Sequence, residues 1–348
     1  MNKSYFQDKC ILVTGSCGTI GSELVHQCLE KYGVKKLIGI DNNETELFFL
    51  GQRYLEHKEA KFYLADIRDP QKLYHIMQGV DIIFHAAAYK HVAMCEISPF
   101  EAVQTNILGV KNIISAAAEN GVGQVIFTSS DKAANPTNVM GTSKLMGERL
   151  ITAANQTINR NGTIFASTRF GNVLGSNGSV IPIFREQIRE GKPITLTDPQ
   201  MTRFIMSIPE AVQLVINTAQ FACGGEVFVT KMPVIRIQDL AEVMIEELAP
   251  QFGKKPEDIE IKVVGIKPGE KLYEELMTDE ETSRTVELEH YFSVLPALRM
   301  HYGNIEYSYD GVLSEGIDTA YNSRNATPLT KSDLRDFLIR SKLIKGLD

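Results

Sequence analysis

The sequence predicts an α/β protein in which a doubly wound parallel sheet is joined to a smaller C-terminal lobe. Two observations predict this class. The first half of the chain alternates short, continuously apolar runs with helical patterns of apolar residues, and a glycine-rich loop follows the first run. Continuously apolar strands are typical of a parallel sheet that helices cover on both faces. The length of 348 residues is enough for about two domains.

The individual elements follow from the same patterns. Apolar runs in the first half predict strands at 10–14, 37–41, 61–65, 80–86, 124–128 and 163–168. Apolar residues at helical spacing predict helices at 20–32, 98–119 and 139–160. In the second half, Ser207 and Glu210 form the pattern of a capping box before a helix that continues to about Phe221. Further elements are expected at 226–230, 237–252 and 259–264.

The regularity of these patterns also divides the chain. Residues 1–172, with a return contribution from about 207–240, are expected to form the sheet domain. Residues 173–206 and 241–348 are less regular and rich in turn and charged residues. We expect these two segments to form the lobe that binds a substrate.

Charge and cysteine content disfavour several classes of function. Lys and Arg number 36 against 43 Asp and Glu, and this net charge of −7 disfavours non-specific nucleic-acid binding. The five cysteines include no C-x-x-C pair, which favours buried thiols over a metal site or a disulfide framework. The start carries no apolar signal-peptide core, and no apolar run is long enough for a membrane span. We therefore expect a cytoplasmic protein without a bound metal.

A loop with the spacing G-x-x-G-x-x-G separates the first strand from the first helix. It contains Gly15, Gly18, Thr19, Ile20 and Gly21. Glycines at this spacing let the backbone turn sharply and approach a pyrophosphate, which binds at the helix N-terminus. The strand before the loop and the helix after it indicate a Rossmann-type dinucleotide site.

Residues after the second and third strands extend this prediction. Asp41 ends the second strand, where a carboxylate accepts a hydrogen bond from the ribose 2′-hydroxyl and repels a 2′-phosphate. Asn42 follows, and no cationic side chain stands beside it to hold such a phosphate. Asp66 and Ile67 either meet the adenine edge or form a solvated end of the third strand. The expected cofactor is NAD rather than NADP.

Seven stretches through most of the chain resemble the extended short-chain dehydrogenases/reductases, and among them the nucleotide-sugar 4,6-dehydratases of bacterial polysaccharide biosynthesis. These stretches are residues 15–21, 86–92, 105–109, 129–136, 169–176, 197–204 and 267–272. The likeness is strongest to UDP-N-acetylglucosamine 4,6-dehydratases. It implies oxidation at carbon 4, loss of water across carbons 5 and 6, and return of the hydride to carbon 6. It also implies a nucleotide-sugar substrate and a homo-oligomer, a dimer or larger.

The resemblance implies roles for the site residues as well. Asp131 is expected to protonate the leaving hydroxyl, and Lys132 to remove the carbon-5 proton, which requires a lowered amine pKa. Lys144 is expected to hold the nicotinamide ribose. Residues implied in cofactor binding are Ala86, Ala87, Ala88, Lys90 and Asn106, and residues implied in substrate binding are Lys90, His91, Asn172, Arg203, Glu270 and Lys271.

One catalytic position departs from the usual pattern of the superfamily. Where most members carry a tyrosine four residues before the lysine, this chain has Met140, which cannot accept a proton. A subset of the resembling dehydratases also carries methionine there. We therefore expect Ser130 to relay the proton of the carbon-4 hydroxyl to Asp131.

Three alternatives remain open from the sequence. A nucleotide-sugar 4-epimerase shares the fold and the oxidation at carbon 4, but it needs no acid–base pair for carbons 5 and 6 and normally needs the tyrosine. A GDP-linked substrate would meet the same diphosphate-binding residues as a UDP-linked one. Outside enzymes, the chain could be a non-catalytic NAD-sensing protein that has lost its tyrosine. The stereochemical outcome at carbon 5 is also open.

Overall fold

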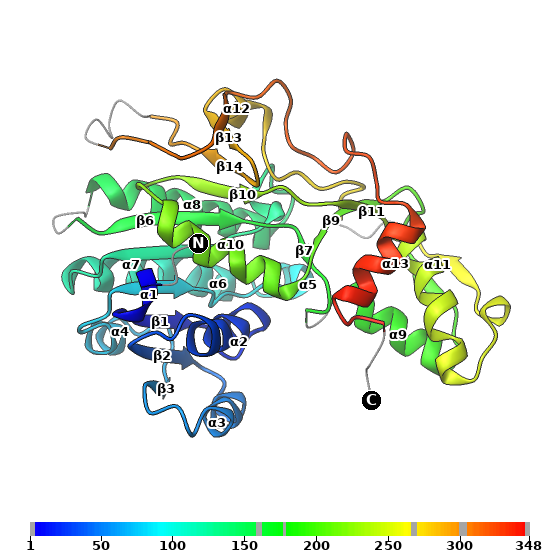
Figure 1. Cartoon of the computed structure of the whole chain (residues 1–348), viewed down its shortest axis with the longest axis horizontal. Helices are drawn as coiled ribbons and strands as arrows, with labels where there is room; N and C mark the ends of the chain where they lie inside the picture. The colour runs from blue at the N-terminus through cyan, green and yellow to red at the C-terminus, as the bar shows by residue number, and fades with distance from the viewer. Residues whose placement is uncertain (1–3, 158–161, 177–178, 266–269, 299–304, 345–348) are drawn as a thin grey trace.

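The computed structural model describes residues 4–157, 162–176, 179–265, 270–298 and 305–344. Its centre is a ten-stranded sheet with the strand order β15-β13-β14-β10-β6-β5-β4-β1-β2-β3 (Figure 1). The strands are β1 Cys10–Thr14, β2 Lys36–Asp41, β3 Ala60–Leu64, β4 Ile82–His85, β5 Gln124–Thr128, β6 Ile164–Arg169, β10 Val227–Thr230, β13 Thr285–Leu288, β14 Tyr291–Val294 and β15 Val312–Glu315. Strands β3 to β10 in this order pair in parallel, and β14, β13 and β15 continue the sheet antiparallel.

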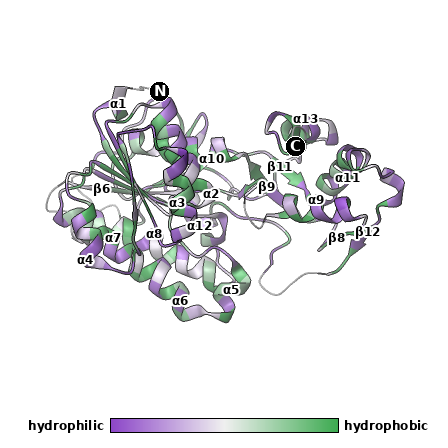
Figure 2. Ribbon diagram, turned by 90° about the horizontal axis from the view of Figure 1, so that it is seen from below, coloured by the Kyte–Doolittle hydropathy of each residue, from purple (hydrophilic) through white to green (hydrophobic). Residues whose placement is uncertain are grey.

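Helices cover both faces of this sheet. Figure 2 shows α2 and α10 on one side and α4, α7 and α8 on the other. The helices of this larger body are α1 Ser4–Gln7, α2 Thr19–His26, α3 Glu44–Arg53, α4 Pro70–Ile76, α5 Val92–Ile97, α6 Pro99–Val103, α7 Val110–Glu119, α8 Val139–Thr157, α10 Ile208–Phe221 and α12 Asp279–Thr282. The predicted doubly wound fold is confirmed. The winding reverses between β1 and β4, and ligands bind at such a switch point in sheets of this kind.

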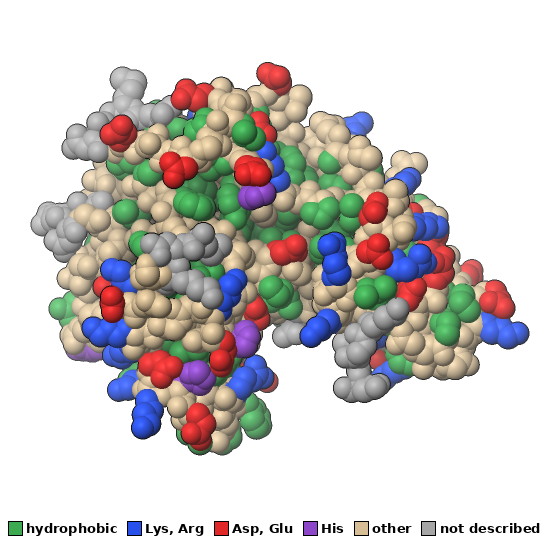
Figure 3. All heavy atoms as spheres, in the orientation of Figure 1, with side chains coloured by type: hydrophobic (Ala, Val, Ile, Leu, Met, Phe, Trp, Pro, Cys, Tyr) green, Lys and Arg blue, Asp and Glu red, His purple; other side chains and the backbone are tan. Residues whose placement is uncertain are grey.

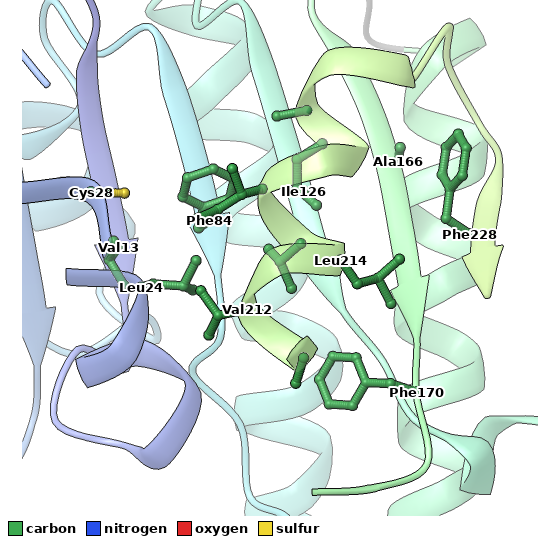
Figure 4. Close-up of a cluster of buried hydrophobic side chains, with 14 of the residues drawn as sticks. Val13, Leu24, Cys28, Phe84, Ile126, Ala166, Phe170, Val212, Leu214 and Phe228 are labelled. Carbon is green, nitrogen blue, oxygen red and sulfur yellow. The ribbon is translucent and has the colours of Figure 1, made fainter. Parts of the chain in front are cut away.

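The core lies between the sheet and these helices. In Figure 4, Leu24 of α2 and Val212 of α10 point toward Val13 and Phe84 on the strands. All four side chains are fully buried. The predicted capping box is present at the start of α10, where the Ser207 hydroxyl accepts from the backbone N–H of Glu210. Burial of the apolar faces thus fixes α2 and α10 on one side of the sheet.

A smaller lobe projects beside the large sheet, and a notch separates the two along the lower edge of Figure 3. Its helices are α9 Val180–Glu190, α11 Ile237–Leu248 and α13 Lys331–Arg340. Its strands are β8 Ile194–Leu196 with β12 Ile261–Val263, and β11 Val234–Arg236 with β9 Thr202–Met206 and β7 Asn172–Val173. A separate apolar cluster, which includes Phe184, Leu240 and Leu334, fills this lobe.

The chain is divided differently from the sequence-based expectation in two respects. Residues 234–240 were expected in the sheet domain, but they form β11 and the start of α11 in the lobe. Residues 241–348 were expected in the lobe, but 285–315 contain the three antiparallel strands that extend the large sheet. Phe292 and Val294 of β14 pack into the core of the larger body. Strands so short carry too few residues for their alternation to assign them to a sheet.

Two expected helices also contain π-helical turns, at Gln27–Lys31 and Gln104–Gly109. A π-helical turn inserts one extra residue into a helix. This insertion changes the spacing of the apolar residues too little for the sequence to reveal it. Among the described residues, no helix combines the length and apolar character needed to cross a membrane. The expectations of a cytoplasmic location and of a homo-oligomer stay predictions.

A buried arginine ties the body to the segment around α12. Arg169, at the end of β6, is 1% exposed. Its guanidinium donates to Glu148 of α8 at 2.6 Å and to Glu281 of α12 at 2.9 Å, and also to the carbonyl of Leu276 at 2.8 Å. All three guanidinium nitrogens of Arg169 therefore donate hydrogen bonds, as a buried charge requires.

We expect Arg169→Ala to lower the free energy of unfolding by about 3–5 kcal/mol, because it leaves two buried carboxylates without their partner. Urea denaturation followed by circular dichroism measures this change. Arg189→Ala is the control, since it breaks an exposed pair with Glu186 and should alter stability by less than about 1 kcal/mol. Equal losses in the two variants would contradict the structural role of Arg169.

Candidate active site

Two adjoining cavities open where β1 and β4 end. The first, of about 730 Å³, extends from the glycine loop to residues 128–132, helix α8 and residues 170–176. The second, of about 480 Å³, lies over the ends of β2 and β3. Of the predicted cofactor residues, the first cavity is lined by Gly15, Gly18, Thr19, Ile20, Gly21, Ala86, Ala88, Lys90 and Lys144, and the second by Asp41, Asn42, Asp66, Ile67 and Ala87. The glycine loop therefore lies between the two cavities and borders both.

Two positions in this loop can only be glycine. Gly15 has φ +65°, and a Cβ there would lie 2.7 Å from the backbone of Ala87. A Cβ on Gly21 would lie 2.0 Å from the carbonyl oxygen of Gly15. Helix α2 begins directly after Gly18, and no side chain caps it. The first turn of α2 is thus brought close to the loop without a side chain in between, as a pyrophosphate site requires.

Two aspartates, Asp41 and Asp66, line the second cavity. Asp41 accepts from the backbone N–H of Cys17 at 2.9 Å and from that of Asn43 at 3.0 Å. A carboxylate has about four acceptor positions, so Asp41 can still accept from a ribose hydroxyl. Asp66 is held by Arg68 at 2.6 Å, and this hydrogen-bonded partner lowers the pKa of the Asp66 carboxyl. Asp66 therefore lines the cavity just after β3, and its contact with adenine stays a prediction.

Ser130, Asp131 and Lys132 form a compact cluster on the wall of the first cavity. The Ser130 hydroxyl donates to Asp131 at 3.0 Å and accepts from the backbone N–H of Lys132 at 3.0 Å. Lys132 Nζ lies 2.9 Å from an Asp131 oxygen. Asp131 is 5% exposed, and the Lys132 side chain is 34% exposed. All three residues line the cavity, where Lys132 is the more exposed of the ion pair and Asp131 is joined to Ser130.

The protonation state of Lys132 differs from the expectation. Burial would lower its amine pKa, but the carboxylates of Asp131 and Glu274 outweigh burial and raise it. Burial would raise the pKa of Asp131, but Lys132 outweighs it and holds that pKa below its ordinary value. The pair is thus an ammonium and a carboxylate here, whereas a carbon-5 base must be neutral. The expectation of a lowered pKa for Lys132 is therefore wrong for the structure as it stands, because the sequence does not show that Glu274 lies beside this amine.

Met140 and Lys144 line the same cavity from α8, one helical turn apart. Lys144 is 6% exposed, its Nζ donates to the carbonyl of Thr128 at 2.9 Å, and it lies 4.7 Å from the centre of the Phe127 ring. Burial lowers the pKa of Lys144 to about 8. Met140 is 3% exposed and packs with Cys95, which also lines the cavity. The methionine therefore occupies an apolar corner, and its thioether carries no proton to donate.

Some of the other predicted site residues line the first cavity, and others lie outside both cavities. Lys90, His91 and Asn172 line the first cavity. Asn106 does not line either one; its buried amide donates to the Tyr89 carbonyl and to Ser143, and it accepts from the Tyr89 N–H. Arg203 binds backbone carbonyls of Thr202 and Lys271. Lys271 binds Glu275 and the carbonyls of Ala134 and Asn135, and Glu270 is exposed outside both cavities.

One residue of the cluster was missed. Glu274 is 5% exposed and lies 3.8 Å from Lys132 Nζ and 3.3 Å from Arg203 Nε. Its two oxygens each accept from the amide of Asn172 at 2.8 Å. The sequence shows only that Glu274 and Glu275 are adjacent, and nothing in it distinguishes the buried carboxyl from the one that pairs with Lys271.

Comparison with known proteins places this chain in a family. The family described as "polysaccharide biosynthesis protein" matches residues 11–296. The chain belongs to this family. The predicted likeness is confirmed by an inverting UDP-N-acetylglucosamine 4,6-dehydratase of Campylobacter jejuni, which is 36% identical over 312 residues, covering 89% of this chain and 90% of that protein.

Other known proteins are similar over nearly the whole chain. An uncharacterized membrane protein of Methanocaldococcus jannaschii is 48% identical over 335 residues, covering 96% of each chain. A UDP-glucose 4-epimerase of Rickettsia felis is 35% identical over 342 residues, again covering 96% of each. The X-ray structure of Pen from Bacillus thuringiensis has 40% identity and a TM-score of 0.90, covering 98% of this chain and all of that one.

We expect Gly21→Ala to weaken dinucleotide binding about tenfold or more, because its methyl group would overlap the Gly15 carbonyl and force the loop apart. Isothermal titration calorimetry with NAD measures the affinity. Gly51→Ala, in helix α3, is the matched control, since its added methyl group would meet Phe62 at an ordinary 3.9 Å. Unchanged affinity in Gly21→Ala would argue against the loop as the pyrophosphate site.

Proposed function

We propose that this protein catalyses the NAD-dependent 4,6-dehydration of UDP-N-acetylglucosamine to the 4-keto-6-deoxy sugar. The observation that carries the proposal is the Asp131–Lys132 pair on the wall of the cavity that begins at the glycine loop. Oxidation at carbon 4 alone needs no such pair, whereas elimination of water needs an acid and a base side by side. The dehydratase of Campylobacter jejuni supports the same activity.

The two cavities fit NAD as the cofactor. Gly15 and Gly21 leave the space that a pyrophosphate needs, and Asp41 keeps acceptor positions for a ribose hydroxyl. Among the described residues that line the second cavity, none is a lysine or an arginine that would hold a 2′-phosphate. Bound NAD supplies the acceptor and donor of a hydride, and every proton is handled by the side chains of the chain.

We assign those protons as follows. Ser130 passes the proton of the carbon-4 hydroxyl to Asp131 through their 3.0 Å hydrogen bond. Asp131 then protonates the leaving hydroxyl at carbon 6, and neutral Lys132 removes the proton from carbon 5. Lys144, fixed by the carbonyl of Thr128, places a buried amine beside the reacting sugar and cofactor. Met140 fills the place of a tyrosine without chemistry of its own.

A 4-epimerase is the second candidate, because a relative in Rickettsia felis carries that name. Epimerisation needs a single group that removes and returns the carbon-4 hydroxyl proton. The buried position of Asp131, bound to both Ser130 and Lys132, favours elimination over that simpler exchange. A non-catalytic NAD-sensing role is less consistent with the complete acid–base cluster.

Incubation with UDP-N-acetylglucosamine, followed by mass spectrometry, tests the proposal. Loss of one water from the sugar nucleotide is the expected result. An isomer of unchanged mass would establish epimerisation, and no change in any sugar nucleotide would favour the sensor. Parallel incubation with the GDP-linked sugar decides between the two nucleotides.

We expect Asp131→Asn and Lys132→Ala each to reduce turnover by about 10²–10⁴-fold, because each removes one partner of the acid–base pair. Steady-state dehydration assays measure turnover, and calorimetry with NAD serves as the control. Affinity for NAD should survive both changes, since neither side chain forms the glycine loop. Near-normal turnover in either variant would remove that residue from the mechanism.

Met140→Leu should retain substantial activity, because leucine nearly preserves the volume in the apolar corner beside Cys95. Ser130→Ala should slow the formation of NADH in a single turnover, because it removes the hydroxyl that reaches Asp131. Stopped-flow absorbance after mixing with substrate follows this step. An inactive Met140→Leu together with an unaffected Ser130→Ala would exclude the serine relay.

A further inference from the structure

Glu274 lies directly behind the acid–base pair and is used by none of the steps above. Its Oε1 is 3.8 Å from Lys132 Nζ, compared with 2.9 Å for the contact between Lys132 and Asp131. It does not line the cavity, whereas Lys132 and Asn172, both of which it contacts, do line it. Glu274 can therefore influence a substrate only through the side chains that it contacts, which include Lys132, Asn172 and Arg203.

The surroundings of Glu274 bring the pKa of its carboxyl near neutral pH. Burial, and after it the charge of Asp131, raises the pKa of the Glu274 carboxyl to about 7. Arg203, Lys132 and the amide of Asn172 act in the opposite direction, because they stabilise the carboxylate. Asp131 and Lys132 face it from the turn after β5, and Arg203 faces it from β9. A group with this pKa can take up and release a proton near neutral pH.

The proposed dehydration leaves one proton without a holder. Lys132 is an ammonium in this structure and must lose a proton before it can remove another from carbon 5. Asp131, its closer partner, already has to receive the proton of the carbon-4 hydroxyl. Among the described residues, Glu274 is the other carboxylate in ion-pair contact with Lys132.

We propose that Glu274 is a positioning residue that takes the ammonium proton of Lys132 and holds it while the neutral amine acts on carbon 5. The inference rests on the proposed 4,6-dehydration. An N–H bond of Lys132 breaks as an O–H bond forms on Glu274, and the freed lone pair then binds the carbon-5 proton. The C–H electron pair forms the double bond between carbons 5 and 6, and Asp131 protonates the hydroxyl that leaves as water.

The cycle closes without any additional proton. When the hydride returns to carbon 6, Lys132 gives its newly gained proton back to carbon 5. Glu274 then returns the stored proton to Lys132, and the ion pair with Asp131 is restored. Asn172 and the backbone N–H of Phe204, at 3.3 Å, keep the Glu274 carboxyl in place through these changes.

Glu274→Gln tests this proposal, because an amide keeps the shape but cannot hold the proton. At neutral pH we expect dehydration to fall about 100-fold. Activity should recover as the pH rises, because loss of the Glu274 charge lowers the pKa of Lys132 and solvent can then take its proton. Glu274→Asp, which keeps a carboxyl, should retain more activity at neutral pH. Wild-type rates in Glu274→Gln at neutral pH, or an equal loss at every pH, would overturn the proposal.

Glu287→Gln is the matched control, since it breaks an ion pair with Lys231 and lines neither cavity. Its pH profile should equal that of the unaltered protein. Calorimetry with NAD shows whether each variant keeps its folded cofactor site.

A second measurement separates this inference from the proposed function. In protein with ¹³C-labelled lysine, the NMR signal of Lys132, assigned by its loss in Lys132→Arg, reports the amine pKa directly. We expect that pKa to be lower in Glu274→Gln than in the unaltered protein. If the unaltered protein releases no water from the sugar nucleotide, the proposed function fails. In that case a lowered Lys132 pKa would keep Glu274 as its proton partner, and an unchanged pKa would overturn the inference.

Discussion

The active site depends on a single buried guanidinium, that of Arg169. It joins Glu148 of α8 to Glu281 of α12 and the carbonyl of Leu276, so two separate stretches of chain converge on the end of β6. Helix α8 carries Met140 and Lys144, and the stretch before α12 carries Glu274. Because a buried charge is stable only when it is fully paired, these stretches cannot separate without leaving charged groups alone in the interior.

The same constraint explains why two lysines of one cavity differ in character. Lys144 is buried against an aromatic ring and a carbonyl, and burial dominates, so its pKa falls to about 8. Lys132 is flanked by Asp131 and Glu274, and these charges dominate, so its pKa rises. Neighbouring charges, rather than depth alone, thus decide which amine is ready to give up a proton.

Much of this arrangement could be predicted from the sequence because its signals are local. The glycine loop, the parallel strands and the capping box at Ser207 each depend on a few consecutive residues, and the structure contains all three. The three antiparallel strands could not be predicted, because their placement depends on pairing with distant residues. The π-helical turns could not be predicted either, because one inserted residue barely changes the apolar pattern. Asn106 illustrates the limit: it was expected to bind the cofactor, but its amide binds the backbone of Tyr89, which lines the cavities, and Asn106 itself lines neither.

The role of Glu274 could not be predicted from the sequence for a related reason. Its chemistry comes from Asn172 and Lys132, which lie more than a hundred residues before it in the chain. Arg203 and Lys271 carried the expected charges, but both are engaged with backbone carbonyls. Residue type could identify these positions, and only the tertiary contacts could assign what each of them holds.

The late position of β14 in the chain has a consequence for biosynthesis. Strand β10 pairs with β6 on one side, and its other side is covered by residues 291–294. While the chain emerges from the ribosome, every strand from β1 to β10 is complete about sixty residues before that cover exists. During this interval the hydrogen-bonding groups along one side of β10 are open to any extended peptide. Chaperone contact at that stage would therefore protect the growing chain from joining its neighbours on the same message.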